Sequence, residues 1–293
     1  MAWTVRLAAA AEKTLLKLDP PVARRIAKRL GPPLRRLPAL MDINSRFRLD
    51  GRTALVTGAG RGIGRACAIA LAQAGAEVWL AARTKAEIEQ AAAEIRAAGG
   101  SAHVAACDVT KSEEVTKLVT SMPVLDILVN NAGTNIPEPF VEVSEAHLDQ
   151  LLALNVRAAF LVAQAAARKM LEGKTRGAII NMSSQMGHVG AVNRSVYRMT
   201  KHALEGLTKA MALELAPHGI RVVSIAPTFI ETPMYRKMRT EKPEFEKWVT
   251  DRIPAGKAGQ PEDVAAAVVF ASSPAASLVT GTSLLVDGGW TAQ

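Results

Sequence analysis

The chain has 293 residues, of which 49% are hydrophobic and 4% aromatic, and its formal net charge is +9. This length allows one large α/β domain with a sizeable core, and abundant Ala, Val, Leu and Ile suit helices packed on a parallel sheet. Two cysteines, Cys67 and Cys107, exclude a disulfide framework and favour a reducing cytoplasm. The sequence shows no secretory pattern and no apolar run of roughly 18 residues, so we expect no membrane span.

The positive charge is concentrated at the N-terminus. Of the 36 Lys and Arg and 27 Asp and Glu, residues 1–48 hold eleven and three, which leaves 25 and 24 for the remainder. The main part of the chain is therefore close to neutral, and we expect it to have no nucleic-acid partner.

Residues 1–48 form a basic N-terminal arm, and the patterns predict a short strand over 2–7 and helices over 12–18 and 22–30. The stretch AEKTLLKLDPPVARRIAKRL resembles the start of the RelE/ParE toxin family. The strands that would carry that family's nuclease residues have no counterpart, so we expect no nuclease activity. The arm is interpreted as a fused remnant ahead of Met41, with an RNA- or membrane-touching segment or a transit peptide as alternatives.

From Leu49 to Gln293 we predict a separate domain, which opens on a dinucleotide-type motif. An apolar strand over Thr53–Val56 is followed by the turn Thr57-Gly58-Ala59-Gly60-Arg61-Gly62-Ile63-Gly64 and a helix over 65–74. A glycine-rich turn between a strand and a helix is the setting of a pyrophosphate site, because the helix N-terminus faces the anion.

Each glycine of the turn has a physical reason. Gly58 allows a tight turn, Gly62 lets a pyrophosphate approach the backbone, and Gly64 lets helix and strand pack closely. Glycines are common in turns, so the motif alone is weak.

The second strand, over 76–82, ends where NAD enzymes place an acid on the ribose 2′-hydroxyl. This chain has Ala82 and then Arg83 there, and Arg61 in the glycine turn adds a second cation. Arginine binds a 2′-phosphate by paired charge-assisted hydrogen bonds, so we predict NADP(H) in preference to NAD(H). The alternative is that both arginines are solvated loop charges.

Strands and helices alternate along the rest of the chain, as in a parallel sheet with crossover helices. Helices are predicted over 85–98 and 144–171 and from near Ser112 and Pro261, and strands over 102–106, 127–129, 178–182, 221–225 and 284–286.

A proton-handling trio follows the strand over 178–182. Tyr197 and Lys201 are four residues apart, so they share a helix face, and Ser184 lies thirteen residues before the tyrosine. A phenol has a pKa of about 10, and a cation within roughly 4–6 Å favours its ionised form. The Ser184 hydroxyl could hold a substrate oxygen beside it. Alone, the pair could also be a chance spacing on an exposed face.

Taken together, the turn Thr-Gly-x-x-x-Gly-x-Gly and Ser184, Tyr197 and Lys201 resemble the short-chain dehydrogenase/reductase family over residues 49–293. The resemblance implies a Rossmann-type doubly wound parallel sheet of about seven strands in the order 3-2-1-4-5-6-7. It also implies reversible hydride transfer between NADP(H) and a carbonyl or secondary alcohol.

The resemblance assigns four catalytic roles. Tyr197 would be the acid/base, Lys201 the cation that lowers its pKa and grips the nicotinamide ribose, and Ser184 the group that orients the carbonyl. Asn155, in the middle of a predicted helix, would open that helix locally and hold a water linked to the lysine. Without the family, Asn155 is a satisfied buried amide.

The same resemblance implies an adenosine site. Asp108 would meet the adenine amino group and Val109 would pack on the ring, while Asn131, Ala132 and Gly133 would line the ribose and Asn130 would tie adjacent strands. From the residues alone, Asp108 is also predicted to cap the helix near Ser112.

A nicotinamide site is implied after the strand over 221–225. The family's Pro-Gly-x-x-x-Thr pattern places Pro227, Ile230 and Thr232 around the nicotinamide amide. The chain departs from the pattern with Thr228 in place of Gly and Ser224 in place of Asn.

The substrate is left open between a 3-oxoacyl thioester or small ketone, which is favoured, and a sugar or polyol. Residues 233–256 are predicted to form a mobile lid, in which Arg236, Lys237 and Arg239 could meet an anionic substrate or form a solvated face. A non-catalytic NADP-binding regulator is the alternative of another class. The family also implies a homo-oligomer, a tetramer or dimer, and the histidines show no metal-site spacing.

Overall fold

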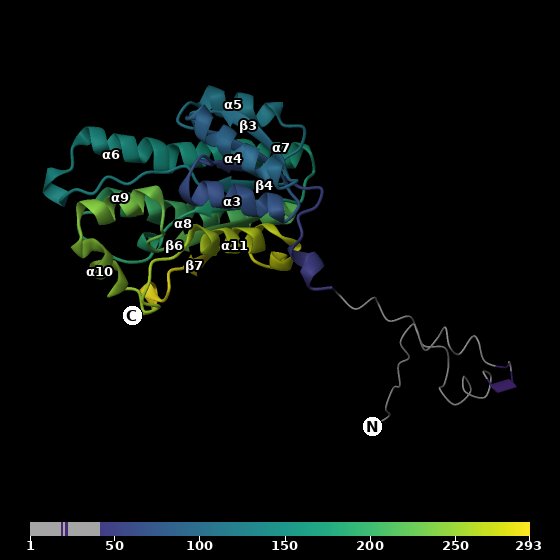
Figure 1. Ribbon diagram of the computed structural model, residues 1–293. Coiled ribbons are helices and arrows are strands. Elements are labelled where there is room, and N and C mark those ends of the chain that lie inside the picture. Colours follow the sequence, from purple (N-terminus) through teal and green to yellow (C-terminus); the bar gives the residue numbers. More distant parts are fainter. Residues whose placement is uncertain (1–18, 20, 23–41) are drawn as a thin grey trace. The chain divides into compact units, whose positions relative to one another are not determined.

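The computed structural model describes residues 19, 21–22 and 42–293 (Figure 1). The chain divides into two compact units, Met1–Ile43 and Asn44–Gln293. The predicted strand and helices of the arm, and with them the toxin resemblance, lie almost entirely outside the described residues.

The second unit begins at Asn44, five residues before the predicted boundary, because a short helical turn packs onto the domain. In this turn, η1 (Asn44–Phe47), the guanidinium of Arg46 donates hydrogen bonds to the Pro274 carbonyl at 2.5 Å and to the Ser277 hydroxyl at 3.1 Å. The rings of Phe47 and Phe270 lie 6.3 Å apart.

A seven-stranded, wholly parallel sheet has the predicted order β3-β2-β1-β4-β5-β6-β7. Its strands are β1 (Thr53–Thr57), β2 (Glu77–Ala82), β3 (Ser101–Ala106), β4 (Ile127–Asn130), β5 (Ala178–Met182), β6 (Arg221–Pro227) and β7 (Thr282–Val286). The central strands β1, β4 and β5 are buried along their whole length. This burial on both faces explains their continuous apolar runs.

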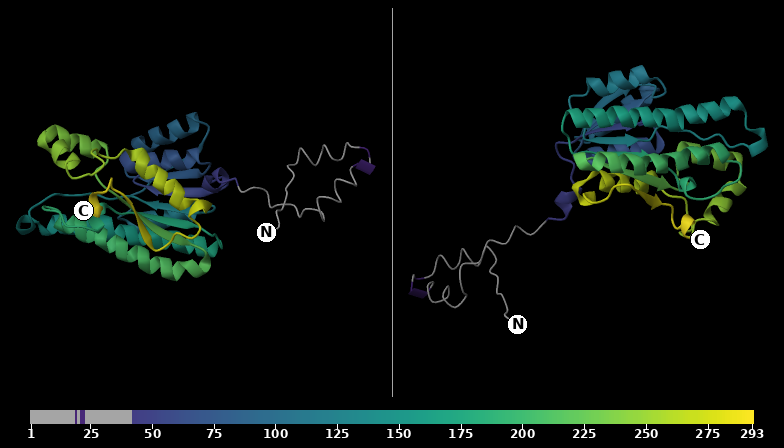
Figure 2. Two further views of the ribbon diagram at one scale, coloured as in Figure 1. Left: turned by 90° about the horizontal axis from the view of Figure 1, so that it is seen from below. Right: turned by 180° about the vertical axis from the view of Figure 1, so that it is seen from behind.

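Helices cover both faces of the sheet, and each face has its own core. One layer holds α3 (Gly62–Gln73), α4 (Lys85–Ala97) and α11 (Pro261–Ser272); the other holds α5 (Ser112–Ser121), α7 (Ala159–Glu172) and α8 (Ser195–Leu215). Figure 2 shows the long helices α7 and α8 running side by side over one face. The predicted doubly wound fold is confirmed.

The single helix predicted over 144–171 is interrupted. It consists of α6 (Glu145–Leu152), a π-helical turn η3 (Ala153–Ala158) and α7. The stretch 145–172 is long and apolar enough to cross a membrane by length and composition. Its inward side chains, among them Val162, Ala163 and Met170, are fully buried in the core beside the sheet, as in a core helix of a folded domain.

The predicted lid region folds into α9 (Pro233–Glu241) and α10 (Glu244–Thr250). The two helices gather around a small aromatic core of Tyr235, Phe245 and Phe229. The three basic residues are ion-paired on this surface: Arg239 with Glu231 at 3.1 Å, Arg236 with Glu231 at 3.8 Å and Lys237 with Glu241 at 3.7 Å. These pairs favour the solvated-face interpretation.

The remaining short helical turns are η2 (Phe140–Glu142), η4 (Gln185–Gly187), η5 (Ala216–His218), η6 (Pro274–Ala276) and η7 (Trp290–Ala292).

Candidate active site

The glycine turn after β1 forms a backbone cradle at the start of α3. Gly58 and Gly62 have backbone φ angles of +65° and +55°, which residues other than glycine adopt only at a cost in free energy. A Cβ on Gly64 would lie 2.2 Å from the Gly58 carbonyl oxygen. Because Arg61 precedes α3 without a side-chain cap, the first N–H groups of the helix are available to an anion.

Asn131 holds this cradle from the neighbouring strand. Its amide nitrogen donates to the carbonyls of Thr57 at 2.9 Å and Gly58 at 3.3 Å. The Thr57 hydroxyl in turn accepts the backbone N–H groups of Asn131 and Ala132, at 3.0 and 3.1 Å. The end of β4 is thus joined to the glycine turn.

Asn130 ties neighbouring elements together, as predicted. Its buried amide donates to the carbonyl of Ala159 at 2.7 Å and to the Asn181 side chain on β5 at 3.3 Å.

Asp108 does not cap α5, and that prediction is wrong. Its carboxylate accepts the backbone N–H and the hydroxyl of Thr110, at 3.0 and 2.8 Å, and α5 instead follows Lys111 without a side-chain cap. Burial raises the pKa of Asp108, but the Thr110 hydrogen bonds and the charges of Arg83 and Lys111 outweigh it, so the pKa is lowered. The carboxylate lies in a tight turn after β3, within reach of the Arg83 charge.

Arg83 and Arg61 are both exposed, Arg83 after β2 and Arg61 in the glycine turn. Within the described part of the chain no carboxylate lies within salt-bridge distance of Arg83. Arg61 is 72% exposed and reaches Glu87 only at 3.8 Å, which makes a weak surface pair. The guanidinium groups of Arg83 and Arg61 could both hold a phosphate. Val109 is buried beside Asp108.

Ser184 and Tyr197 come from two elements that meet at the carboxyl end of the sheet. Ser184 follows β5, where its hydroxyl accepts the N–H of Met186 at 3.1 Å and donates to the Pro227 carbonyl at 3.4 Å. Tyr197 lies in the first turn of α8. Burial raises the pKa of its phenol, while a hydrogen bond with Ser184 and the charge of Arg194 act in the opposite direction.

Lys201 lies one turn further along α8 and is 5% exposed. Its ammonium donates to the Met182 carbonyl at 2.8 Å and lies 5.5 Å from the centre of the Tyr197 ring. Burial lowers the pKa of Lys201 to about 8, and the carboxylate of Glu205 opposes this shift. We expected Lys201 to lower the phenol's pKa, but burial has the largest effect and raises that pKa, and the groups that oppose it are Ser184 and Arg194.

Asn155 occupies the π-helical turn and is 1% exposed. Its amide exchanges two hydrogen bonds with the backbone of Thr134, at 2.8 and 2.9 Å, and donates to the Thr200 hydroxyl at 3.2 Å. A Cβ on Gly133 would lie 3.2 Å from the Asn155 oxygen and 3.8 Å from the Lys201 nitrogen. The local opening of the helix at Asn155 is confirmed.

The turn after β6 lies against the glycine cradle. Thr228 donates its N–H to Val286 at 3.1 Å, and Ile230 pairs with Gly259 in an isolated bridge. Thr232 begins α9 by accepting the N–H of Tyr235, and a Cβ on Gly62 would lie 3.2 Å from its methyl group. Thr232 thus lies next to the glycine cradle, while the Pro227 carbonyl lies beside Ser184. The Thr228 hydroxyl is buried and has no hydrogen-bond partner among the described residues.

Sequence reasoning missed a buried acid behind the lysine. Glu205 is 8% exposed, and its carboxylate accepts the hydroxyl of Ser224 at 2.7 Å. A Lys and a Glu four residues apart on a largely buried helix were the available signal. The other partners of the carboxylate are Ser283 on β7 and His188 after η4, which no local pattern reveals.

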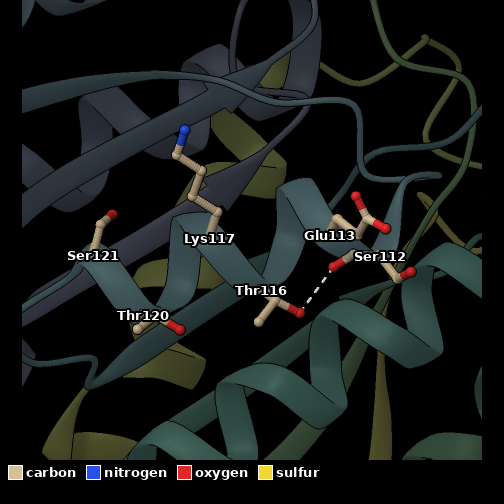
Figure 3. Close-up of a pocket in the computed structure, with 6 residues that line it drawn as sticks. All are labelled: Ser112, Glu113, Thr116, Lys117, Thr120 and Ser121. Atoms are coloured by element: carbon tan, nitrogen blue, oxygen red, sulfur yellow. Dashed lines mark hydrogen bonds between the residues drawn. The ribbon is translucent and has the colours of Figure 1, made fainter.

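Two other features lie outside this cluster. An open hollow runs along α5 and is lined by Ser112, Glu113, Thr116, Lys117, Thr120 and Ser121, all from that one helix (Figure 3). None of these six residues belongs to the candidate site after β5 and at the start of α8. In the described part of the chain, no group of three His, Cys, Asp or Glu side chains is placed to hold a metal ion.

A glycine cradle with a serine, a tyrosine and a lysine at the same end of a doubly wound sheet is typical of a nicotinamide-dependent oxidoreductase. Residues 58–291 match the family model described as Enoyl-(Acyl carrier protein) reductase. The chain belongs to the short-chain dehydrogenase/reductase family, and it is an oxidoreductase that acts on CH–OH groups or the corresponding carbonyls.

Curated relatives cover most of the chain. L-xylulose reductase of Mesocricetus auratus is 41% identical over 83% of this chain and 97% of its own length. Galactitol 2-dehydrogenase (L-tagatose-forming) of Cereibacter sphaeroides is 42% identical over 86% and 99%. The solved gluconate 5-dehydrogenase of Burkholderia cenocepacia, in complex with NADP and tartrate, is 35% identical with a TM-score of 0.81 and covers 85% and 99% of the two chains.

Proposed function

We propose that the protein transfers a hydride between NADP(H) and a sugar, polyol or sugar-acid substrate, with Tyr197, Lys201, Ser184 and Asn155 as its catalytic residues. The observation that carries this proposal is that Ser184 and Tyr197 lie next to a buried lysine at the carboxyl end of the sheet. The glycine cradle lies at the same end.

The chain's residues fit a nicotinamide dinucleotide. The glycine cradle leaves no room for side chains where a pyrophosphate would approach, and the first turn of α3 offers uncapped N–H groups. Pro227, Ile230 and Thr232 would hold the nicotinamide amide, and Asp108, Val109, Asn131, Ala132 and Gly133 would line the adenosine. When bound, the cofactor donates or accepts the hydride.

Proton transfer falls to the protein. In the reductive direction the Tyr197 hydroxyl donates its proton to the substrate carbonyl oxygen as the hydride reaches the carbon, and the Ser184 hydroxyl holds that oxygen. The phenolate left behind is stabilised by the nearby Lys201 ammonium. In the oxidative direction the phenolate takes the alcohol proton. Asn155 would fix the backbone of residues 133–134 beside Lys201. It would also hold the water that relays a proton to and from the lysine.

The raised phenol pKa suits the reductive direction. At neutral pH the Tyr197 hydroxyl carries its proton and can act as the acid without further adjustment.

For the substrate, the relatives support the sugar and polyol alternative better than the favoured 3-oxoacyl thioester. Two of the three named above act on xylulose or galactitol, and the third is a gluconate dehydrogenase. Arg83 and Arg61 support NADP(H), because a 2′-phosphate would find Arg83 where NAD enzymes place an acid and a second cation, Arg61, in the glycine turn.

The test is turnover of NADPH and NADH with a matched panel of ketoses, keto-acids and 3-oxoacyl thioesters, and of NADP and NAD with polyols and aldonates. The proposal expects the highest kcat/KM for a ketose, polyol or sugar acid with NADP(H). A preferred thioester would contradict the substrate class, and no turnover of any substrate would favour the regulator.

A homo-oligomer is also proposed. Large apolar side chains are exposed on α7 and α8, among them Phe160 and Leu213, the latter 80% exposed, and on the β7 side Leu278 is 97% exposed. Two such faces suit a dimer or tetramer. Light scattering of the purified protein decides the number of subunits, and a monomer at all concentrations would refute the proposal.

A cytoplasmic location and the absence of a nucleic-acid partner remain expectations.

A further inference from the structure

A buried polar cluster lies directly behind the candidate site. Its centre is Glu205 on α8, whose Oε2 accepts the Ser224 hydroxyl on β6 at 2.7 Å, while Oε1 accepts the Ser283 hydroxyl on β7 at 3.3 Å. His188, just past η4, places Nε2 3.3 Å from the same Oε1 and 3.1 Å from the Ser283 hydroxyl. Side chains from three other segments, β6, β7 and the residues after η4, therefore converge on this one carboxylate of α8.

The cost of burying this carboxylate indicates that it has a role. A carboxyl group that is 8% exposed loses most of its hydration, and a neutral residue of similar size would avoid this cost. The hydroxyls of Ser224 and Ser283 offset part of it. Ser224 donates the shortest of these hydrogen bonds from a fully buried position on β6.

Glu205 lies one helical turn after Lys201, on the same face of α8. Within the described part of the chain, no carboxylate lies within salt-bridge distance of Lys201, whose ammonium is bonded to the Met182 carbonyl. The ionisable groups that face Glu205 are Lys201 from α8 and His188 from the segment after η4; β6 and β7 contribute only serines. The carboxylate opposes the effect of burial on the pKa of Lys201.

The same carboxylate also anchors the segment that carries Ser184. A Cβ on Gly187 would lie 3.2 Å from the Glu205 Cγ and 3.2 Å from the Lys201 carbonyl oxygen, so η4 packs directly on α8. His188 follows at once and is joined to Glu205 and to β7.

We propose that Glu205 is a positioning residue: its buried charge keeps Lys201 cationic, and its contact with His188 fixes the segment between Ser184 and α8. The proposal rests on the proposed function, in which Lys201 supports the Tyr197 phenolate. Glu205 itself touches neither substrate nor cofactor.

The test compares Glu205→Gln with Ser224→Ala. The amide of Gln keeps the size of the side chain and a carbonyl that accepts hydrogen bonds, but it removes the charge; Ser224→Ala removes the shortest hydrogen bond and keeps the charge. The readout is the pH profile of the reductive kcat. For Glu205→Gln we expect the alkaline limb to move to lower pH, with a loss of about tenfold at about pH 8.5 and less than about twofold at about pH 6.5. Ser224→Ala should leave the limb in place.

A third variant tests the anchoring role. His188→Gln keeps the Glu205 carboxylate and the Lys201 ammonium in place, so it should raise the substrate KM without moving the alkaline limb. An unchanged KM would refute this half of the proposal.

An alkaline limb unmoved in Glu205→Gln, or moved equally in Ser224→Ala, would show that Glu205 acts only in packing. If Glu205→Gln does not fold, Glu205→Met gives the same readout, because it also removes the charge and keeps the length of the side chain; an unmoved limb again refutes the idea. If the wild type turns over no substrate, the proposed function fails, and the pH dependence of NADPH binding, followed by NADPH fluorescence, then tests Glu205 alone.

Discussion

The side chain of Asn155 is bonded to both backbone groups of Thr134, donating to its carbonyl at 2.8 Å and accepting its N–H at 2.9 Å. The two residues are 21 positions apart, and this pair links the opened turn of the α6–α7 helix to the chain that leaves β4. Because Gly133 precedes Thr134, the pair also fixes the backbone that lies next to Lys201.

For Asn155→Ala we expect a loss of stability together with a loss of activity. The variant leaves the Thr134 backbone without its partners, which costs about 1–3 kcal/mol and lowers Tm by about 2–10 °C. The measurements are thermal unfolding and reductive kcat. Thr200→Val serves as the control, because it removes one partner of Asn155 and keeps the Thr134 pair; an equal loss of kcat in both variants would contradict a special role of Thr134.

Tyr197→Phe should abolish proton transfer and keep the fold. We expect kcat to fall by about 10²–10⁴, because the phenyl ring fills the same space without a transferable proton. NADPH binding, measured by fluorescence, should be unchanged. Wild-type turnover in this variant would remove Tyr197 from the mechanism, and the regulator interpretation predicts that its biological function survives.

Gly64→Ala should disrupt the phosphate cradle. Its Cβ would lie 2.2 Å from the Gly58 carbonyl oxygen, so α3 must shift, at a cost of about 1–3 kcal/mol, and NADPH binding should weaken. The matched control is Gly206→Ala in α8, where, among the described residues, the added methyl group meets open space beyond its own helix backbone. Isothermal calorimetry with NADPH distinguishes the two, and equal affinities would show that the turn does not bind the cofactor.

Arg83→Ser should reduce the preference for NADP(H). A charged hydrogen bond contributes about 1.5–3 kcal/mol, so the ratio of kcat/KM for NADPH over NADH should fall by about 10–100-fold. Lys117→Ser, an exposed change on α5, controls for the loss of one positive charge. A ratio unchanged by Arg83→Ser would make that arginine a solvated loop charge.

The two directions should depend on pH with opposite sign. Reduction needs a protonated Tyr197 and a charged Lys201. Burial raises the pKa of the Tyr197 phenol and lowers the pKa of Lys201 to about 8. Because Lys201 loses its charge first, the reductive rate should fall as pH rises through about 8. Oxidation needs the phenolate, so its rate should start low at neutral pH and rise with pH. Initial rates in both directions with one substrate pair check this. A reductive rate that stays flat to pH values well above 8 would show that Lys201 keeps its charge when cofactor and substrate are bound.

The strand order was implied by the family resemblance. The sequence by itself determined the alternation of strands and helices and the places of the glycine turn, Ser184, Tyr197 and Lys201. These features are local: apolar runs mark buried parallel strands, and a four-residue interval puts two side chains on one helix face whatever lies around them.

Only the tertiary structure decided how those residues are held. Local pattern predicted one helix over 144–171, whereas the partner that stabilises the opening at Asn155 is Thr134, on a different segment. Asp108 was predicted as a helix cap, but Thr110 binds it in a turn. The partners of Glu205 come from β6 and β7, up to 78 residues along the chain, and the burial that sets the pKa of Tyr197 and Lys201 comes from the same packing. Long-range contacts of this kind leave no period in the sequence, because they depend on which elements the fold brings together.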